Sequence, residues 1–456
     1  MPKNILLIEP DYHNKFPPLG LMKIASYHKL RGDNVVFAKG CKPDLQKMAW
    51  DRIYISTLFS FYWKKTVDTI SYYKKHLGKQ TEIYIGGIMA TLFADELERD
   101  YGVKVIRGLL DKKGQLDTGD HKIIDTLIPD YSILESISYN YGLQDTYIGY
   151  ATRGCPNRCS FCAVNSIEPV FCHYLPIKRQ VQGIESLYGS KKDLVLCDNN
   201  VLASNQFDKI IEDIIDLGFY KGATHNGRLR YVDFNQGIDA RLLNAHKMKL
   251  LSTIAIKPIR IAFDHISMKD LYVDKIKLAK KYDLLNLSNY ILYNYNDKPE
   301  HFYDRLKINV ELNESLGTHI FSFPMKYIPL LEKDRTYVGK YWNRQILRGI
   351  QCVLLATGGK VGTRREFFHA AFGESFSDFL EIVLMPEEYI IYRKAHSTNG
   401  ALDWKKNYKA LSINQKAELM LNLSLGKITD DNIKSSNSVR LKRIYSHYIE
   451  AAKLHS

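Results

Sequence analysis

Three cysteines gathered in one short stretch constrain this chain more than any other feature. Cys155, Cys159 and Cys162 have the spacing C-x3-C-x2-C and follow the apolar run 147–150, which predicts a strand. Thiolates are the soft ligands that iron–sulfur clusters select, and a four-iron cluster normally takes four of them. Three thiolates from one loop therefore leave one iron without a ligand from that loop. An open position at a metal centre is typical of a catalytic site, because a small molecule can bind there.

Two other interpretations of the three cysteines remain open. Cys172 or His173 could complete a four-ligand zinc site, or the cysteines could be unrelated buried side chains. Zinc sites usually pair their cysteines as two C-x2-4-C units, and the sequence contains no second pair. The spacing therefore favours an iron–sulfur cluster over zinc.

The loop resembles the signature of the radical SAM superfamily, including the aromatic residue Phe161 directly before the third cysteine. The resemblance implies a [4Fe–4S] cluster on Cys155, Cys159 and Cys162, with Phe161 as part of the cofactor site. It also implies that S-adenosylmethionine (SAM) binds the open iron through its amino and carboxylate groups. Reductive cleavage of SAM would then yield a 5′-deoxyadenosyl radical, with electrons from an external donor of the flavodoxin or ferredoxin type.

The composition is that of a soluble globular protein with two or three domains. The chain has 456 residues, of which 45% are hydrophobic and 25% charged. No apolar run approaches a membrane span, and the seven cysteines suit a reducing compartment, so we expect a cytoplasmic protein without membrane contact. The net charge of +14 suggests an anionic partner, either nucleic acid or an anionic small molecule. The alternative is a lysine-rich solvated surface.

Short apolar runs alternate with helical patterns at the start of the chain. This alternation predicts a parallel, doubly wound (Rossmann-like) domain over residues 1–128. Its functional edge should be the loops at the carboxyl ends of the strands. The expected strands lie near 5–8, 35–37, 54–57, 83–85 and 103–106, with helices near 18–30 and 66–77.

This domain resembles the cobalamin (B12)-binding-type domain that precedes the barrel in class B radical SAM enzymes. The resemblance rests on the helix start at 17–22, the turn at 85–91 and the stretch 106–108. It implies that Gly86 and Gly87 lie beside a bulky cofactor, although an ordinary tight turn would use the same glycines. The D-x-H-x-x-G motif of some cobalamin proteins is broken here.

His13 stands at the histidine position of that motif, but Phe16 replaces its glycine. Since many members of the group bind cobalamin without the histidine and others have lost the cofactor, the sequence leaves open whether this chain binds cobalamin.

A polar connecting segment, 109–128, leads to a predicted catalytic domain over residues 129–330. Repeating strand–helix units there match the incomplete (β/α)6 barrel of radical SAM enzymes. An open barrel of this kind leaves room for a sizeable substrate. The expected strands lie near residues 148, 195, 232, 261, 291 and 321.

Further cofactor contacts are implied by the order of the elements. Asp198, Asn199 and Asn200 end the second barrel strand, where family members bind the amino group of SAM. Gln236 and Arg241 follow the third strand, where family members face the ribose and carboxylate. An Asx-rich turn and a surface arginine are the alternatives. No side chain is assigned a catalytic role.

The sequence pattern of residues 331–456 predicts a mostly helical C-terminal domain. The stretch 336–365 contains no acidic residue and carries basic and aromatic side chains, a pattern that can grip a phosphate backbone. A solvated helix face would look the same. The whole chain could instead be a basic nucleic-acid-binding protein with a structural or redox-sensing cluster. If it is an enzyme, the sequence leaves open which reaction follows SAM cleavage, and methylation is one candidate. The arginines of the basic stretch are Arg344, Arg348, Arg364 and Arg365.

Overall fold

The structure is a computed structural model that describes residues 2–75, 80–397, 400–426 and 428–453. The chain divides into two compact units. The first comprises Met1–Ile238, Asn244–Lys257 and Ile328–Tyr337, and the second comprises Asp239–Leu243, Pro258–Tyr327 and Val338–Ser456. The domain boundaries at 128 and 330 stay predictions.

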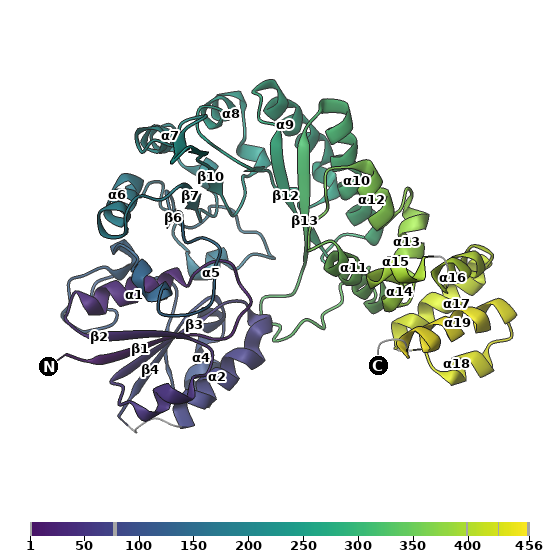
Figure 1. Cartoon of the computed structure of the whole chain (residues 1–456), viewed down its shortest axis with the longest axis horizontal. Coiled ribbons are helices and arrows are strands. Elements are labelled where there is room, and N and C mark those ends of the chain that lie inside the picture. Colours follow the sequence, from purple (N-terminus) through teal and green to yellow (C-terminus); the bar gives the residue numbers. More distant parts are fainter. Residues whose placement is uncertain (1, 76–79, 398–399, 427, 454–456) are drawn as a thin grey trace. The chain divides into compact units, whose positions relative to one another are not determined.

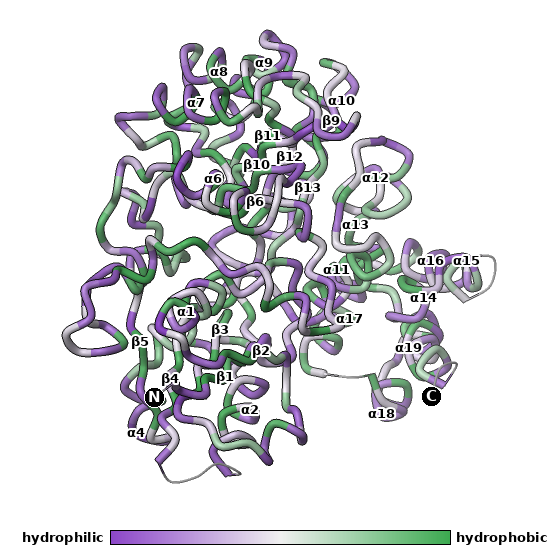
Figure 2. The backbone as a smooth tube through the Cα atoms, turned by 60° about the vertical axis from the view of Figure 1, so that its left-hand side comes forward, coloured by the Kyte–Doolittle hydropathy of each residue, from purple (hydrophilic) through white to green (hydrophobic). Residues whose placement is uncertain are grey.

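The first unit begins with a five-stranded, all-parallel sheet in the order β2-β1-β3-β4-β5. This confirms the predicted doubly wound sheet. Each strand has a short apolar run, such as Ile5–Ile8 in β1, and Figure 2 colours the backbone of the sheet by hydropathy. The strand order reverses between β1 and β3, the point where such sheets bind ligands at their carboxyl edge. The strands are β1 (Asn4–Glu9), β2 (Asn34–Lys39), β3 (Arg52–Thr57), β4 (Glu82–Gly87) and β5 (Lys104–Ile106).

Helices cover both faces of this sheet (Figure 1). Helix α1 (Leu19–Lys29) lies on one face, and α2 (Trp63–Lys75), α3 (Ile88–Leu92) and α4 (Ala94–Tyr101) lie on the other. Strand residues alternate between the two, so Leu6 and Ile8 join the core under α2 and α4. Burial on both faces explains why the strands read as continuous apolar runs rather than as alternating ones.

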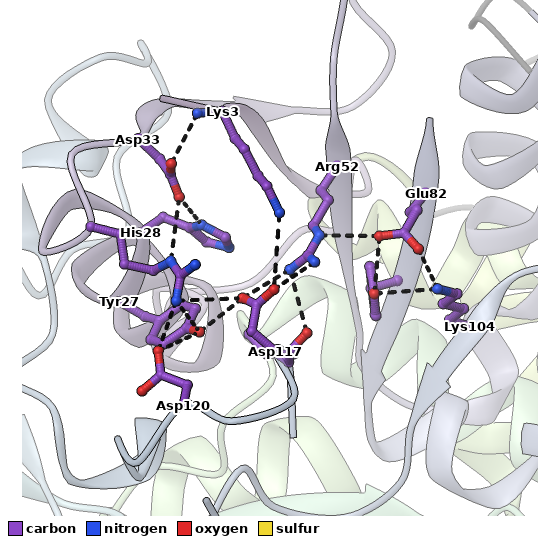
Figure 3. Close-up of polar contacts among 12 residues, drawn as sticks. Lys3, Tyr27, His28, Asp33, Arg52, Glu82, Lys104, Asp117 and Asp120 are labelled. Carbon is purple, nitrogen blue, oxygen red and sulfur yellow. Dashed lines mark hydrogen bonds and ion pairs between the residues drawn. The ribbon is translucent and has the colours of Figure 1, made fainter. Parts of the chain in front are cut away.

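The connecting segment 109–128 folds back onto the amino-terminal edge of the sheet (Figure 3). Asp117 accepts hydrogen bonds from Arg52 Nη2 (2.7 Å) and from the Tyr27 hydroxyl (2.8 Å). Arg52, Glu82 and Lys104 are the first residues of three neighbouring strands. We call this cluster the amino-edge network: Tyr27, His28, Arg31, Asp33, Arg52, Glu82, Lys104, Asp117 and Asp120.

A second parallel sheet of the first unit has the order β10-β7-β6. Its strands are joined by helices, as in a barrel of repeating strand–helix units. A two-stranded antiparallel hairpin, which the sequence did not predict, precedes β10. The elements are β6 (Thr146–Gly149), α6 (Ile177–Tyr188), β7 (Asp193–Leu196), α7 (Phe207–Asp216), β8 (Thr224–His225), β9 (Arg228–Leu229), β10 (Val232–Phe234) and α8 (Ala245–Leu251).

The second unit holds a third parallel sheet, in the order β11-β12-β13. Together the two three-stranded sheets supply the six parallel strands that the sequence predicted, each at its expected place. The elements are β11 (Ile259–Arg260), α9 (Lys269–Lys281), β12 (Asn286–Tyr293), α10 (Pro299–Leu316) and β13 (His319–Lys326).

The remainder of the second unit is helical, as predicted. Its core mixes aromatic and aliphatic side chains. Helices α11 and α13 approach closely because Gly349 has no side chain: a Cβ there would lie 2.1 Å from the Val383 carbonyl oxygen. No helix in the described part of the chain is both long and apolar enough to span a membrane. The helices are α11 (Arg344–Ala356), α12 (Arg365–Phe372), α13 (Phe376–Leu384), α14 (Glu387–Ile391), α15 (Arg393–His396), α16 (Gly400–Lys409), α17 (Ile413–Leu425), α18 (Asp430–Ser435) and α19 (Val439–Ala452).

Candidate metal centre and cofactor site

The cysteine loop leaves the carboxyl end of β6 and is closed at its base by a short backbone bridge. Arg153 N–H donates to the Cys172 carbonyl (3.2 Å), and Cys172 N–H donates to the Arg153 carbonyl (2.9 Å). Gly154 follows with φ +71°, and a Cβ there would lie 2.6 Å from the Val170 carbonyl oxygen. Only glycine fits this close approach, so the two ends of the loop are held together before the first thiol is reached.

The three cysteines of the motif are half-buried, as is Phe161. All seven cysteines of the chain are thiols rather than disulfides. The Cys162 N–H donates to the Cys159 carbonyl (3.0 Å), which places these two in one tight turn ahead of the short helix α5 (Val164–Ile167). The Asn200 side-chain amide points at the Cys155 sulfur, with an Nδ2–Sγ distance of 3.6 Å.

The donor set fits a four-iron cluster. Within the part of the chain that the structure describes, no three His, Cys, Asp or Glu side chains converge as they would on one metal ion. In a four-iron cluster each thiolate binds a different iron, so such convergence is not required. Cys172 and His173, the ligands considered for zinc, face other partners: the Cys172 thiol faces the Tyr174 carbonyl, and His173 Nδ1 accepts from Asn205 N–H.

Asp198 is turned towards the backbone that leads into the cysteine loop. Its carboxylate accepts hydrogen bonds from Ala151 N–H (3.0 Å), from Thr152 N–H and from the Thr152 hydroxyl (2.6 Å). Burial raises the pKa of Asp198 to about 6, while these hydrogen bonds oppose the rise. Asp198 thus ties β7 to the end of β6, and its predicted contact with SAM stays a prediction.

The two asparagines that follow Asp198 also face the loop. Asn199 Nδ2 donates to Glu168 Oε2 (3.0 Å), and Asn200 lies beside the first cysteine. The carboxyl end of β7 and the cysteine loop are therefore brought together, as expected, although the asparagines bind protein groups in this structure.

The other predicted cofactor residues give no support for a cofactor contact. Gln236 is exposed and follows β10. Arg241 belongs to the second unit and pairs with Asp239 (2.8 Å). Gly87 has φ +110°, and a Cβ there would lie 2.2 Å from the Thr57 carbonyl oxygen. The sheet itself therefore requires this glycine. A Cβ on Gly86 would make only ordinary contact with Ile106, so neither glycine argues for a cofactor.

Sequence reasoning missed a chain of buried and half-buried charges at the base of the loop. Arg153 pairs with Glu168 (2.9 Å) and with Asp125 (2.6 Å), and Asp125 also pairs with Lys23 (2.8 Å). The Arg153 guanidinium lies 3.5 Å from the centre of the Tyr150 ring. We call Lys23, Asp125, Arg153 and Glu168 the loop-base network.

Burial governs the ionisation of this network. Burial lowers the pKa of Lys23, although Asp125 raises it, and the cations on either side hold the pKa of Asp125 below its usual range despite burial. Lys23 and Asp125 are 102 residues apart in sequence, so no local pattern links them. The one sequence signal that could have pointed to this network is Glu168, which is the first acidic residue after the cysteines.

The chain is similar in fold to an enzyme of known structure. This rests on two solved structures of the radical S-adenosylmethionine methyltransferase TsrM from Kitasatospora setae. The form with cobalamin and a [4Fe–4S] cluster bound has a TM-score of 0.51 at 12% identity, covering 77% of this chain and 79% of TsrM. The form with tryptophan substrate and the SAM analogue aza-SAM has a TM-score of 0.52 at 12% identity, covering 77% and 76%.

At this identity the likeness shows the fold alone. No family model matches the sequence, and no curated protein matches it.

Proposed function

We propose that the chain is a radical SAM enzyme whose cluster is held by Cys155, Cys159 and Cys162. The observation that carries the proposal is the closed loop at the end of β6, which presents three half-buried thiols. Cys172, at the base of the loop, faces the Tyr174 carbonyl instead. The three thiolates would hold a [4Fe–4S] cluster, which, once reduced, would supply the electron for cleaving SAM to methionine and a 5′-deoxyadenosyl radical.

The chain's own residues hold and shield this site. The Arg153–Cys172 bridge fixes the ends of the loop, and the Asn200 amide donates towards the Cys155 sulfur. Hydrogen bonds to cluster sulfurs raise the reduction potential, because they stabilise the added negative charge. Asp198 keeps the ends of β6 and β7 in register.

Anaerobic reconstitution tests the proposal. The wild type should bind about four irons per chain, and replacing the three cysteines with Ala should abolish iron binding. Dithionite and SAM should then yield 5′-deoxyadenosine or S-adenosylhomocysteine. Stoichiometric zinc in an oxygen-stable protein would overturn the proposal.

A second candidate function is cobalamin-dependent methyl transfer, and the fold shared with TsrM favours it. Incubation with dithionite and SAM, with and without cobalamin, separates the two reaction classes. S-adenosylhomocysteine that forms only with cobalamin supports methyl transfer. Deoxyadenosine alone supports hydrogen abstraction by the radical.

For the substrate, we favour an anionic small molecule over a polynucleotide. The stretch 336–365 has no acidic residue of its own, but Arg348 pairs with Glu387 (2.5 Å) and Arg365 pairs with Glu314. These pairs offset two of the positive charges that would bind phosphates. The electron donor would be of the flavodoxin or ferredoxin type, in a reducing cytoplasm that keeps the thiols reduced.

Salt dependence tests this choice. A nucleic-acid ligand would lose affinity steeply with salt, and replacing Arg344 or Arg364 with Ala would lower the slope by about one for each phosphate that is no longer neutralised. Absence of polynucleotide binding at low salt is the expected result.

A further inference from the structure

We propose that Glu168 is the positioning residue of the cysteine loop, and that the first sheet holds it in place through Arg153, Asp125 and Lys23. The inference rests on the proposed function for the purpose of the loop. It assigns a role to residues outside the cysteine motif and outside the expected cofactor contacts.

One carboxylate joins three parts of the loop site. Glu168 Oε2 accepts from the Gly154 N–H (2.6 Å) and from Asn199 Nδ2 (3.0 Å), and Oε1 accepts from Arg153 Nη1 (2.9 Å). Gly154 directly precedes the first cysteine, and Asn199 follows β7. The position of this side chain therefore decides where the loop leaves β6 and how it meets the end of β7.

The position of Glu168 is in turn set by a fixed partner. Arg153 is 8% exposed, stacks on Tyr150 and spans Glu168 and Asp125 with its two Nη atoms. A planar guanidinium that binds two carboxylates at once has little freedom to rotate. Arg153 thus transfers the position of Asp125 to Glu168.

The last link reaches the first sheet. Asp125 lies in the short helix η3 (Ile124–Thr126), and its Oδ1 accepts a hydrogen bond from Lys23 Nζ (2.8 Å). Lys23 is 7% exposed and lies on α1, which packs on the first sheet. Positive and negative charges alternate from Lys23 to Glu168, so each buried charge depends on its neighbours. A displacement of α1 would therefore change the loop that carries the thiols.

Labelling of the apo protein with iodoacetamide tests the proposal without any cluster. Glu168→Gln keeps the shape of the side chain but removes its charge, and Lys23→Met breaks the far end of the network without touching the loop. We expect labelling of Cys155, Cys159 and Cys162 to rise about tenfold in Glu168→Gln and less in Lys23→Met, because local opening becomes easier.

Two cysteines and one variant serve as controls. Exposed Cys41 and buried Cys352 should keep their wild-type labelling rates, and Arg228→Gln, which removes an exposed ion pair with Asp145, should change none. After reconstitution, Glu168→Gln should also show an altered EPR signal of the reduced cluster on adding SAM. Circular dichroism would confirm that each variant is folded.

Unchanged labelling of the three cysteines in Glu168→Gln would overturn the inference. An equal rise in the labelling of buried Cys352 would also overturn it, because that indicates global unfolding. If the wild type binds no iron but Glu168→Gln still exposes the three thiols selectively, the proposed function fails and the positioning role stands.

Discussion

Two charge networks anchor the connecting segment 109–128, and they differ in how much water reaches them. In the amino-edge network, the side chains of Arg31, Glu82 and Lys104 are 34%, 36% and 58% exposed, whereas those of Arg52 and Asp117 are only 9% and 16% exposed. In the loop-base network, the exposed fraction of the side chains ranges only from 8% to 17%. The comparison teaches that similar carboxylate–cation pairs in one segment can contribute unequally, because exposed charges keep water as an alternative partner.

The largest effect is expected at the loop-base network. Asp125→Asn should lower the free energy of unfolding of the first unit by about 3–5 kcal/mol, because it leaves Lys23 and Arg153 buried with Glu168 as the only anion of that network. Urea unfolding followed by circular dichroism measures the change. A loss no greater than that in Asp117→Asn would remove the contrast between the networks.

An intermediate effect is expected from Asp117→Asn in the amino-edge network. Asp117 accepts two hydrogen bonds from Arg52 and one from Tyr27, but Arg52 retains Glu82 as a partner (3.1 Å). A hydrogen bond to a charged group contributes about 1.5–3 kcal/mol, and the Asn side chain keeps one acceptor oxygen, so a loss about the size of one such bond is expected in the same urea experiment. A loss as large as that in Asp125→Asn would show that the remaining Arg52–Glu82 pair does not limit the cost.

Mild acid should distinguish the networks, since only the amino-edge network contains a histidine. Burial lowers the pKa of His28, although Asp33 (2.7 Å) raises it, and His28 also contacts the Tyr54 hydroxyl (3.0 Å). The folded state thus holds a neutral His28, and the unfolded state gains a proton below its pKa of about 6.5. The stabilising contribution of His28 is present above that pH and is lost as the pH falls.

His28→Gln should therefore reduce the loss of stability between about pH 7 and 5. Arg52 and Asp117 face the same imidazole and remain in the variant. The measurement is the difference between the wild-type and variant unfolding curves at each pH, which cancels the contribution of buried His447. Identical slopes would show that His28 does not govern this pH range.

The smallest effect is expected from Asp120→Asn. Its carboxylate contacts Tyr27 (2.9 Å) and Arg31 (2.8 Å), but the Arg31 side chain is 34% exposed, so salt and water screen the pair. Urea unfolding should give nearly the wild-type midpoint. A marked loss would mean that the amino-edge network acts as one cooperative unit.

Much of the architecture could be predicted from the sequence, because local patterns encode it. The run Ile5–Ile8 is apolar on both faces, which marks a buried parallel strand, and the cysteine spacing marks the loop. The closed base of the loop could not be foreseen, since Gly154 needs its conformation only because the Val170 carbonyl approaches it. Pairs such as Lys23–Asp125 depend on tertiary packing between distant segments.

Asp198 shows a second limit of sequence reasoning. Its place after a strand was predicted correctly. The direction of its side chain, however, is set by the Ala151 and Thr152 N–H groups, which donate hydrogen bonds to the carboxylate. The type and position of a residue thus suggest which partners it can accept, while the fold decides which of them it meets.

The fold-back of segment 109–128 also bears on covalent continuity. Lys112 and Lys113 are exposed and precede every carboxylate through which the segment binds the two networks. A protease cut at this site would separate the polypeptide that forms the first sheet from the one that carries the cysteine loop. The ion pairs Arg52–Asp117 and Lys23–Asp125 would still link the two fragments. The two fragments are therefore suited to reassemble as a split protein, with the first sheet supplied as a separate chain.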